Sequence, residues 1–350
     1  MSGRISVIGG DGIGPEVIAE GVKLLRHLST RHDLNLTFRM LDLGAERTLR
    51  DGSTLPDDVF EILREDTDAI FLGALGDPRI PDHRHARDIL LGLRFKLDLF
   101  VNLRPVRLLH ERYGVLKNKG PDEIDFVVFR ENTEGLYTGV GGQFKRGTPD
   151  EVAIEAELNT YKGVARIIRE AFEFASRTGR GSVCMSDKSN AMRHGHDLWQ
   201  RVFWNIASEY PTIRAFHLYV DVLAMEMVRA PEQFDVIVTN NLFGDIITDL
   251  GAQLQGGIGL AGSGNIHPGR VSLFEPVHGS APTLAGHGTA NPIATFLTAG
   301  MLLEHLGYPD LNSDIQSGVQ QLLHRGQVTP ELGGTLTTSA VGDALLACLA

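Results

Sequence analysis

Alternation of short apolar runs with longer amphipathic segments is the feature of this chain that most restricts its fold. The apolar runs lie at 5–8, 36–41 and 68–72. Segments with helical periodicity separate them, at 15–28 and 57–64. Because strands that alternate with helices are typical of a sheet with crossover helices, this part of the chain is predicted to form an α/β sheet.

The middle of the chain has a different pattern. Three strand candidates, 125–130, 135–140 and 151–158, are joined by Gly-rich turns rather than by helices. Further on, the pattern predicts a helix at 160–177, a strand at 182–187, a helix at 197–208, a strand at 234–239 and an apolar helix at 292–306. Composition changes near Arg104 and Gly256, so we expect a domain of residues 104–256 inserted into a domain made of 1–103 and 257–350.

Length and charge exclude several classes of function. The 350 residues are enough for one large or two smaller domains, and the net charge of −11 argues against binding to nucleic acid. Cys184 and Cys348 lie among apolar residues, which favours small buried thiols in a reducing compartment. We find no signal-peptide pattern and no apolar run of membrane-spanning length, so a cytoplasmic location without membrane partners is expected.

The Gly-rich opening, GGDGIGP, follows a strand and precedes a helix, as phosphate-binding loops do. It fails the dinucleotide fingerprint because Pro15 stands where the third Gly belongs. A Rossmann fold is therefore disfavoured, and the loop can equally be a tight turn between strand and helix.

An acid pair follows the strand FDVIVT. Asp245 and Asp249 are spaced i, i+4, which places them on one face of a helix, where two carboxylates can share a divalent cation. The alternative is that the acids only stabilise the helix start. Asp221 is an acid among apolar residues, and its burial would require a partner or a metal.

Several other residues are candidates for chemistry. Arg94, Arg104 and Arg130 adjoin apolar segments, and guanidinium groups grip carboxylates in a bidentate way. Tyr137 and Lys188 lie beside strand ends, and such a pair can divide acid and base roles. Taken singly, each arginine is better explained by a salt bridge, and Tyr137 and Lys188 are each better explained by a structural or exposed position.

Together the motifs resemble those of the β-decarboxylating dehydrogenases, the family of isopropylmalate, isocitrate, homoisocitrate and tartrate or D-malate dehydrogenases. The resemblance covers nearly the whole chain, through GGDGIGPEV, LRFKLDLFVNLRPVR, FRENTEGLYTG, NNLFGDIITD, FEPVHGSAP and TPELGG. It implies the fold of that family, an α/β fold of two domains with a large mixed sheet that is not a Rossmann fold. It also implies a metal-dependent oxidative decarboxylation of an (R)-malate-type acid, with hydride passing to NAD.

The resemblance assigns roles to individual residues. It implies that the three arginines bind the malate carboxylates. It implies that Asp245 and Asp249 hold Mg²⁺ or Mn²⁺ together with Asp221 of a second subunit. Lys188, also from that subunit, would accept the hydroxyl proton, and Tyr137 would protonate carbon after CO₂ leaves. The resemblance therefore implies a homodimer with shared active sites.

For the cofactor, the family uses the segment that matches 275–291. The expected NAD-binding residues are Ile13, Glu275, His278, Gly279, Ser280, Ala281, Thr283, Leu284 and Asn291. NAD-dependent relatives usually carry Asp-Ile after GSAP, whereas this chain has Thr283-Leu284. No charged residue for a 2′-phosphate stands at the matching positions, Pro330 and Gly334, so NAD is favoured over NADP and tolerance of NADP is left open.

In the family, the stretch before Arg94 recognises the substituent on the malate. Leu90 and Leu91 resemble the apolar pair of isopropylmalate dehydrogenases, whereas RENTEGLY resembles the other members. We expect Arg84, His85 and Arg87 to make this stretch basic and to select D-malate, tartrate or a malate with a polar substituent. The alternatives are 3-isopropylmalate and a stretch whose charges only face solvent.

Two rival classes remain. A noncatalytic regulatory subunit would be expected to lose Tyr137, Lys188 or one of the acids, and this chain keeps them all. A metal-independent 2-hydroxyacid dehydrogenase is disfavoured by the failed Gly fingerprint. An active oxidoreductase is therefore predicted.

Overall fold

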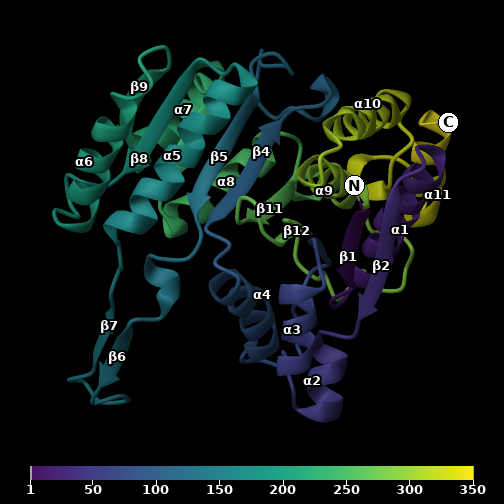
Figure 1. Cartoon of the computed structure of the whole chain (residues 1–350), viewed down its shortest axis with the longest axis horizontal. Helices are drawn as coiled ribbons and strands as arrows, with labels where there is room; N and C mark the ends of the chain where they lie inside the picture. Colours follow the sequence, from purple (N-terminus) through teal and green to yellow (C-terminus); the bar gives the residue numbers. More distant parts are fainter. Residues whose placement is uncertain (1, 350) are drawn as a thin grey trace. The chain divides into compact units, whose positions relative to one another are not determined.

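The computed structural model describes residues 2–349, and contacts within the chain divide it into two compact units (Figure 1). The first unit comprises 1–99, 108–121 and 252–350, and the second comprises 100–107 and 122–251. The first unit thus contains both ends of the chain, and the second is built mainly from its middle.

The first unit contains the helices predicted at 15–28, 57–64 and 292–306. Its elements are β1 (Ser2–Ile8), α1 (Gly14–Arg31), β2 (Asn35–Leu41), α2 (Ala45–Asp51), α3 (Asp57–Glu65), β3 (Ala69–Leu72), α4 (Arg84–Lys96), η1 (Glu111–Tyr113), η4 (Ile258–Leu260), β11 (Gly262–Ile266), β12 (Ser272–Pro276), α9 (Ile293–His305), α10 (Pro309–Arg325), η5 (Pro330–Leu332) and α11 (Thr338–Cys348).

The strands of this unit lie in the order β2-β1-β3-β12-β11. All neighbours are parallel except β11, which is antiparallel to β12. In β3 successive side chains point to opposite faces, so Ala69 and Phe71 join one core cluster and Ile70 and Leu72 join another. Helices α1, α9, α10 and α11 supply the first cluster, and α3 and α4 supply the second. Because both faces are covered, β3 is apolar throughout.

The second unit has its own set of elements. They are β4 (Val101–Arg107), β5 (Asp125–Glu131), η2 (Leu136–Thr138), β6 (Gly141–Phe144), β7 (Val152–Glu155), α5 (Tyr161–Thr178), β8 (Ser182–Asp187), α6 (Gly195–Ala207), β9 (Arg214–Tyr219), α7 (Val220–Arg229), η3 (Pro231–Gln233), β10 (Val236–Thr239) and α8 (Asn241–Leu254), whose last residues belong to the first unit.

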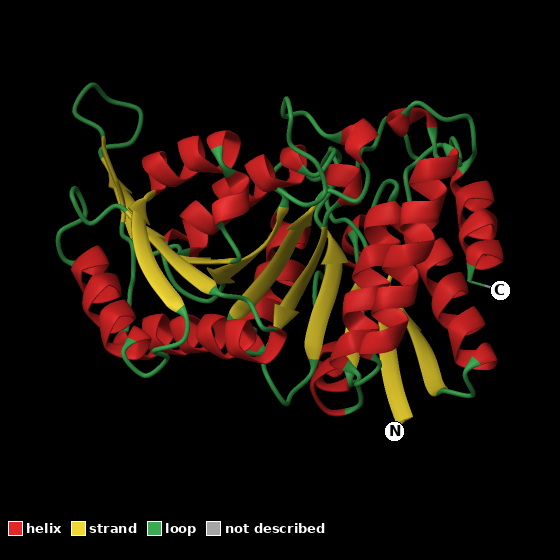
Figure 2. Ribbon diagram, turned by 90° about the horizontal axis from the view of Figure 1, so that it is seen from above, coloured by secondary structure: helices red, strands yellow, loops and turns green. Residues whose placement is uncertain are grey.

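Its strands lie in the order β4-β5-β10-β8-β9, with β4 antiparallel to β5 and the others parallel. Figure 2 shows helices flanking these strands. On α5 the buried residues recur every three or four positions, which gives the helix one apolar face. Its N-terminus is capped by Thr160, whose hydroxyl accepts a hydrogen bond from the amide of Gly163 at 3.0 Å. From the buried face, Phe172 stacks on Tyr210 with ring centroids 5.1 Å apart.

Strands β6 and β7 form a separate antiparallel ribbon that extends away from the rest of the second unit (Figure 1). We call this ribbon, residues 141–155, the arm. The predicted strand at 135–140 is wrong, because Gly135 at φ 83° and Gly139 at φ 70° turn the chain into the short 3-10 helix η2 instead. The next predicted strand, 151–158, contains β7, but the observed strand is shorter than the predicted one.

The predicted α/β class and the family's fold are confirmed. None of the helices among residues 2–349 is long and apolar enough to cross a membrane.

Candidate active site

The Gly-rich loop after β1 is a close-packed turn. Gly10 and Gly12 have φ of 75° and 58°, and a Cβ on Gly12 would lie 1.9 Å from the carbonyl oxygen of Ser280. Between them the Asp11 carboxylate accepts hydrogen bonds from the amides of Ala45 and Gly76 at 2.7 and 2.8 Å. The glycines are therefore required by backbone contacts inside the protein, which fits the turn alternative.

His85, on α4, packs against this loop and not on a surface that could face a substrate. Its side chain is fully buried, and Nε2 lies 2.9 Å from Asp11 Oδ2. The expectation that His85 belongs to an exposed basic stretch that selects the substrate is therefore wrong, because the ring is buried and its Nε2 contacts Asp11. Arg84 and Arg87 are exposed, and Arg87 donates to its neighbour Asp88 from Nε and Nη2 at 3.4 and 3.5 Å.

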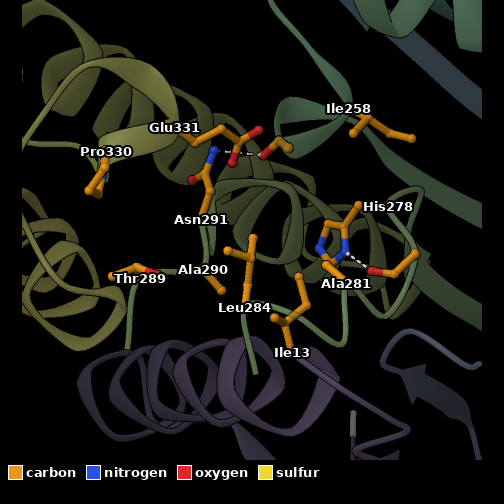
Figure 3. Close-up of a pocket in the computed structure, with 12 residues that line it drawn as sticks. Ile13, Ile258, His278, Ala281, Leu284, Thr289, Ala290, Asn291, Pro330 and Glu331 are labelled. Carbon is orange, nitrogen blue, oxygen red and sulfur yellow. Dashed lines mark hydrogen bonds between the residues drawn. The ribbon is translucent and has the colours of Figure 1, made fainter. Parts of the chain in front are cut away.

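A cavity of about 490 Å³ lies in the first unit beside this loop (Figure 3). Its lining is Ile13, Ile258, Gly259, His278, Gly279, Ala281, Leu284, Thr289, Ala290, Asn291, Pro330 and Glu331. The volume and the mixed apolar and polar lining are typical of sites for a small molecule or cofactor. No Lys or Arg is among these residues.

His278 leaves one polar atom of this lining without a partner. Its Nδ1 lies 3.1 Å from the carbonyl oxygen of Gly279, whereas its buried Nε2 has no hydrogen-bond partner among the described residues. Burial lowers the pKa of His278, so the ring is neutral at physiological pH. A buried ring nitrogen beside an empty volume fits a ligand that forms hydrogen bonds, as a nucleoside does.

The predicted cofactor residues divide into two groups. Ile13, His278, Gly279, Ala281, Leu284 and Asn291 line the cavity, whereas Glu275, Ser280 and Thr283 do not. Sequence reasoning missed Glu331, although it lies in the TPELGG motif. Burial raises the pKa of Glu331, and the amide of Asn291 beside it opposes the shift. Asn291 also donates to the carbonyl oxygen of Gly259 at 3.2 Å, as Figure 3 shows.

Arg94 lies in the first unit, on α4, and is buried. Its Nη2 atom donates to Glu275 Oε1 at 3.1 Å, and the same oxygen accepts from Asn265 at 2.9 Å. Glu275 therefore orients a buried guanidinium group instead of lining the cavity.

A cluster in the second unit surrounds Asp245. Its Oδ1 accepts a hydrogen bond from the buried Arg130, and its Oδ2 accepts from the Tyr137 hydroxyl at 2.7 Å. The guanidinium carbon of Arg130 also lies 5.3 Å from the centre of the Tyr137 ring. Asn241, at the start of α8, fixes the other side of Arg130 through hydrogen bonds of 2.7 and 2.9 Å.

Arg104 extends this cluster along α8. Its side chain donates to Asn102 and Thr248, each at 2.8 Å, and lies 3.9 Å from Asp249. Partial burial and the charge of Asp245 raise the pKa of Asp249, while Arg104 and Arg130 oppose the shift. Two acids that repel each other on one helix face are a donor set that suits a hard cation.

Lys188 and Asp221 form a second cluster. The Lys188 ammonium donates to Asp221 Oδ1 at 2.6 Å, and this hydrogen bond lowers the pKa of the Asp221 carboxyl. Lys188 follows β8 directly, and Asp221 lies in the first turn of α7. Among residues 2–349, no three acidic, His or Cys side chains of one chain come together as a metal-binding group. The predicted third metal ligand, Asp221, is therefore not joined to Asp245 and Asp249 within the chain.

The family model described as isocitrate/isopropylmalate dehydrogenase matches residues 4–345. The chain belongs to the isocitrate/isopropylmalate dehydrogenase family. It is an oxidoreductase of this family, which confirms the resemblance that its motifs predict.

Named relatives cover the full length of the chain. A 3-isopropylmalate dehydrogenase of Thermobifida fusca is 47% identical over 97% of this chain and 96% of its own. One of Mycobacterium ulcerans is 46% identical, over 99% of this chain and 100% of its own. Among solved structures, an isocitrate dehydrogenase from Methylococcus capsulatus is similar, with a TM-score of 0.90 and 34% identity over 100% of this chain and 99% of that one. Family membership therefore rests on both sequence and structure.

Proposed function

We propose that the chain is a 3-isopropylmalate dehydrogenase that uses NAD and a divalent metal. The observation that carries this proposal is the identity of 45–48% to full-length relatives of that name. It favours the alternative substrate over the main sequence prediction of a D-malate, tartrate or polar-substituted acid. The exposed positions of Arg84 and Arg87 agree, since groups in solvent give no reason to reject an isopropyl substituent.

Leu90 and Leu91 are the apolar residues that we assign to the isopropyl group. They are adjacent on α4, both are half-buried, and they lie within one turn of Arg94. Removing three carbons from water contributes roughly 2.4 kcal/mol at about 0.8 kcal/mol per CH₂, or about fiftyfold in kcat/KM. The guanidinium groups of Arg94, Arg104 and Arg130 then bind the two carboxylates of the malate.

Proton transfer is assigned to Lys188 and Tyr137. Lys188 accepts the proton of the substrate hydroxyl when hydride leaves, and Tyr137 donates a proton to carbon after CO₂ is lost. The hydrogen bond between Tyr137 and Asp245 supports this assignment because it holds the hydroxyl beside the acid pair. Oxidation comes first, since only a β-keto acid can accept the electrons of the breaking C–C bond.

Asp245 and Asp249 are the proposed metal ligands, with Asp221 of a second subunit as the third. These carboxylates would hold Mg²⁺ or Mn²⁺, which would supply electrostatic stabilisation of the negative charge that develops on the substrate oxygen. The separation of Asp221 from the acid pair within one chain is what a shared site requires.

A homodimer is supported by apolar side chains that flank both clusters. Ile246, between the two acids, is 60% exposed, and Met225, one turn after Asp221, is 62% exposed. Phe144 and Ile154 of the arm are also exposed, at 66% and 60%. Large exposed apolar side chains of this kind suit a protein interface, and we assign these four to contacts with a second copy of the chain.

NAD is the proposed cofactor in the cavity of Figure 3. A 2′-phosphate would meet no Lys or Arg among the lining residues and would lie in a cavity that contains the acid Glu331. The absence of an Asp at Thr283 weakens the usual discrimination, so the proposal predicts a preference for NAD and not a strict requirement. The comparison of kcat/KM for NAD and NADP measures it.

The decisive experiment compares five acids in one assay. Purified chain with Mg²⁺ and NAD is expected to oxidise 3-isopropylmalate with about fiftyfold higher kcat/KM than D-malate, and to release CO₂. Tartrate, isocitrate and homoisocitrate complete the series. A preference for D-malate or tartrate would instead support the substrate class that the basic stretch before Arg94 predicts.

A regulatory subunit is tested in the same assay. An active enzyme forms NADH when assayed alone and loses this activity in Lys188→Ala. A chain without activity on any of the acids, with folding and cofactor binding intact, would instead support the regulatory alternative.

A further inference from the structure

A buried histidine holds the backbone of Lys188. The Lys188 amide donates to His196 Nδ1 at 2.7 Å, and the His196 side chain has no exposed surface. Lys188 is the first residue after β8, so this amide is not part of the strand ladder. Because a backbone amide can only donate, Nδ1 must be the unprotonated ring nitrogen, and the ring proton lies on Nε2.

A carboxylate fixes this tautomer. His196 Nε2 lies 3.2 Å from Glu157 Oε2, and the Glu157 side chain is only 8% exposed. Glu157 follows the arm by two residues. The arrangement of carboxylate, imidazole and a third group in line is the one by which proteins orient a histidine ring.

The same carboxylate is connected to the helix that bears the acid pair. The side-chain amide of Asn240 donates from Nδ2 to Glu157 Oε1 at 2.7 Å. Oδ1 of Asn240 accepts a hydrogen bond of 2.8 Å from the backbone amide of Phe243, in the first turn of α8. The Phe243 ring meets the His196 ring edge to face, with centroids 5.6 Å apart. Glu157 therefore joins the loop of Lys188 to the start of α8.

We propose that His196 and Glu157 are positioning residues for Lys188. The pair fixes the Lys188 backbone relative to α8, and with it the starting point of the lysine side chain. The inference rests on the proposed role of Lys188 as the base. No sequence pattern singles out either residue, since a lone His and a lone Glu 39 positions apart carry no motif.

Two substitutions at one position separate positioning from general stability. His196→Asn keeps an acceptor near Nδ1 for the Lys188 amide, whereas His196→Gln places its polar group near Nε2 and loses that acceptor. We expect His196→Gln to lower kcat by about tenfold, to change the substrate KM by less than about twofold, and to raise the solvent deuterium isotope effect on kcat. His196→Asn should keep kcat within about threefold of the wild type.

Glu157→Gln is the second variant and keeps the proposal testable should His196→Gln not fold. The glutamine cannot accept with both side-chain atoms, so one of the donors from Asn240 and His196 loses its acceptor. The same rise in the isotope effect is expected. His194→Gln, two residues from His196 and exposed, is the matched control with wild-type kinetics.

The outcomes are distinct from those of the proposed function. Wild-type kcat and isotope effect in both His196→Gln and Glu157→Gln, with Lys188→Ala inactive, would overturn the positioning role alone. Equal loss of kcat in His196→Asn and His196→Gln, in step with lowered thermal stability, would also overturn it. Activity retained in Lys188→Ala would instead remove the proposed base, and the positioning role with it.

Discussion

The carboxylate of Asp245 accepts hydrogen bonds from the Arg130 guanidinium group and the Tyr137 hydroxyl. It also lies 3.7 Å from the guanidinium group of Arg104. Arg130 is almost fully buried, so its charge depends on this carboxylate and on Asn241 for compensation. The acid therefore has two tasks, as the ion-pair partner of a buried arginine and as a proposed metal ligand. Loss of its charge is expected to affect both.

Asp245→Asn tests the metal assignment at this residue. We expect the affinity for Mn²⁺ to fall by at least about tenfold, because an amide is a much weaker ligand for a hard cation. Titration followed by electron paramagnetic resonance measures the free ion directly. Asp150→Asn, at an exposed position of the arm, is the control and should bind Mn²⁺ as the wild type does. Unchanged affinity in Asp245→Asn would refute the assignment.

Cys184 is a buried cysteine, and its burial is expected to make the thiol unreactive. Burial raises the pKa of this thiol far above its usual range, so the reactive thiolate is not formed at neutral pH. The native protein is expected to leave Cys184 unlabelled by iodoacetamide while the denatured protein is labelled, as mass spectrometry of the peptide would report. Rapid labelling of native Cys184 would mean that β8 opens locally.

Helix α8 is packed directly on Arg130, a proposed substrate-binding residue. A Cβ at Gly244 would lie 2.5 Å from Cγ of Arg130, and Arg130 is held on its other side by Asn241. Only the absence of a side chain lets the helix start so near the arginine.

Gly244→Ala is therefore expected to displace Arg130, at about 1–3 kcal/mol for an overpacked site. The KM for the substrate should rise by about tenfold or more, with a smaller change in the melting temperature. Gly181→Ala, whose Cβ would meet only Asp235 at 3.8 Å, is the control. Wild-type KM in Gly244→Ala would show that Arg130 does not bind the substrate.

The end of α9 is expected to give the first unit a pH-dependent stability. Burial lowers the pKa of His305, which packs against Phe274 with ring centroids 5.3 Å apart. The unfolded chain therefore binds a proton more readily than the folded one, and the stability that neutral His305 supports is lost as pH falls below about 6.5.

The melting temperature is thus expected to fall between pH 7.5 and 5.5, and to fall less in His305→Gln. Differential scanning calorimetry at the two pH values measures both. His287→Gln, at an exposed position, should behave as the wild type. An equal fall in all three proteins would assign the pH dependence to other groups.

At the scale of the whole molecule, the proposed dimer makes a quantitative prediction. Asp245 is assigned to one subunit of each site and Lys188 to the other. A heterodimer of Asp245→Asn and Lys188→Ala chains therefore has one site with both defects and one site with none.

Random mixing of the two inactive variants after unfolding and reassembly should restore about a quarter of the wild-type activity, because half of the dimers are heterodimers with one intact site. Each variant alone should stay inactive. No recovery from the mixture, with dimers present by light scattering, would place Asp245 and Lys188 in a site of one chain.

The alternation of apolar and helical segments predicted β1, α1, β2, α3 and β3 of the first unit, since strands covered on both faces are apolar throughout and amphipathic helices are periodic. The helix at 14–31 and the strand at 69–72 lie where the pattern expects them. The segment 135–140 failed because two glycines at positive φ outweigh its strand-like composition. Local pattern also could not show that the arm stands apart from the sheet.

The sequence by itself determined the family, the α/β class and the candidate residue types, because several motifs in a fixed order are specific and because side-chain chemistry is a local property. Only the tertiary structure decided which of these residues meet. It paired His85 with Asp11, which removed that histidine from substrate selection, and it paired His196 with Glu157 behind Lys188. Such pairs join residues 39 to 74 positions apart, and no periodicity in the chain records a contact made by folding.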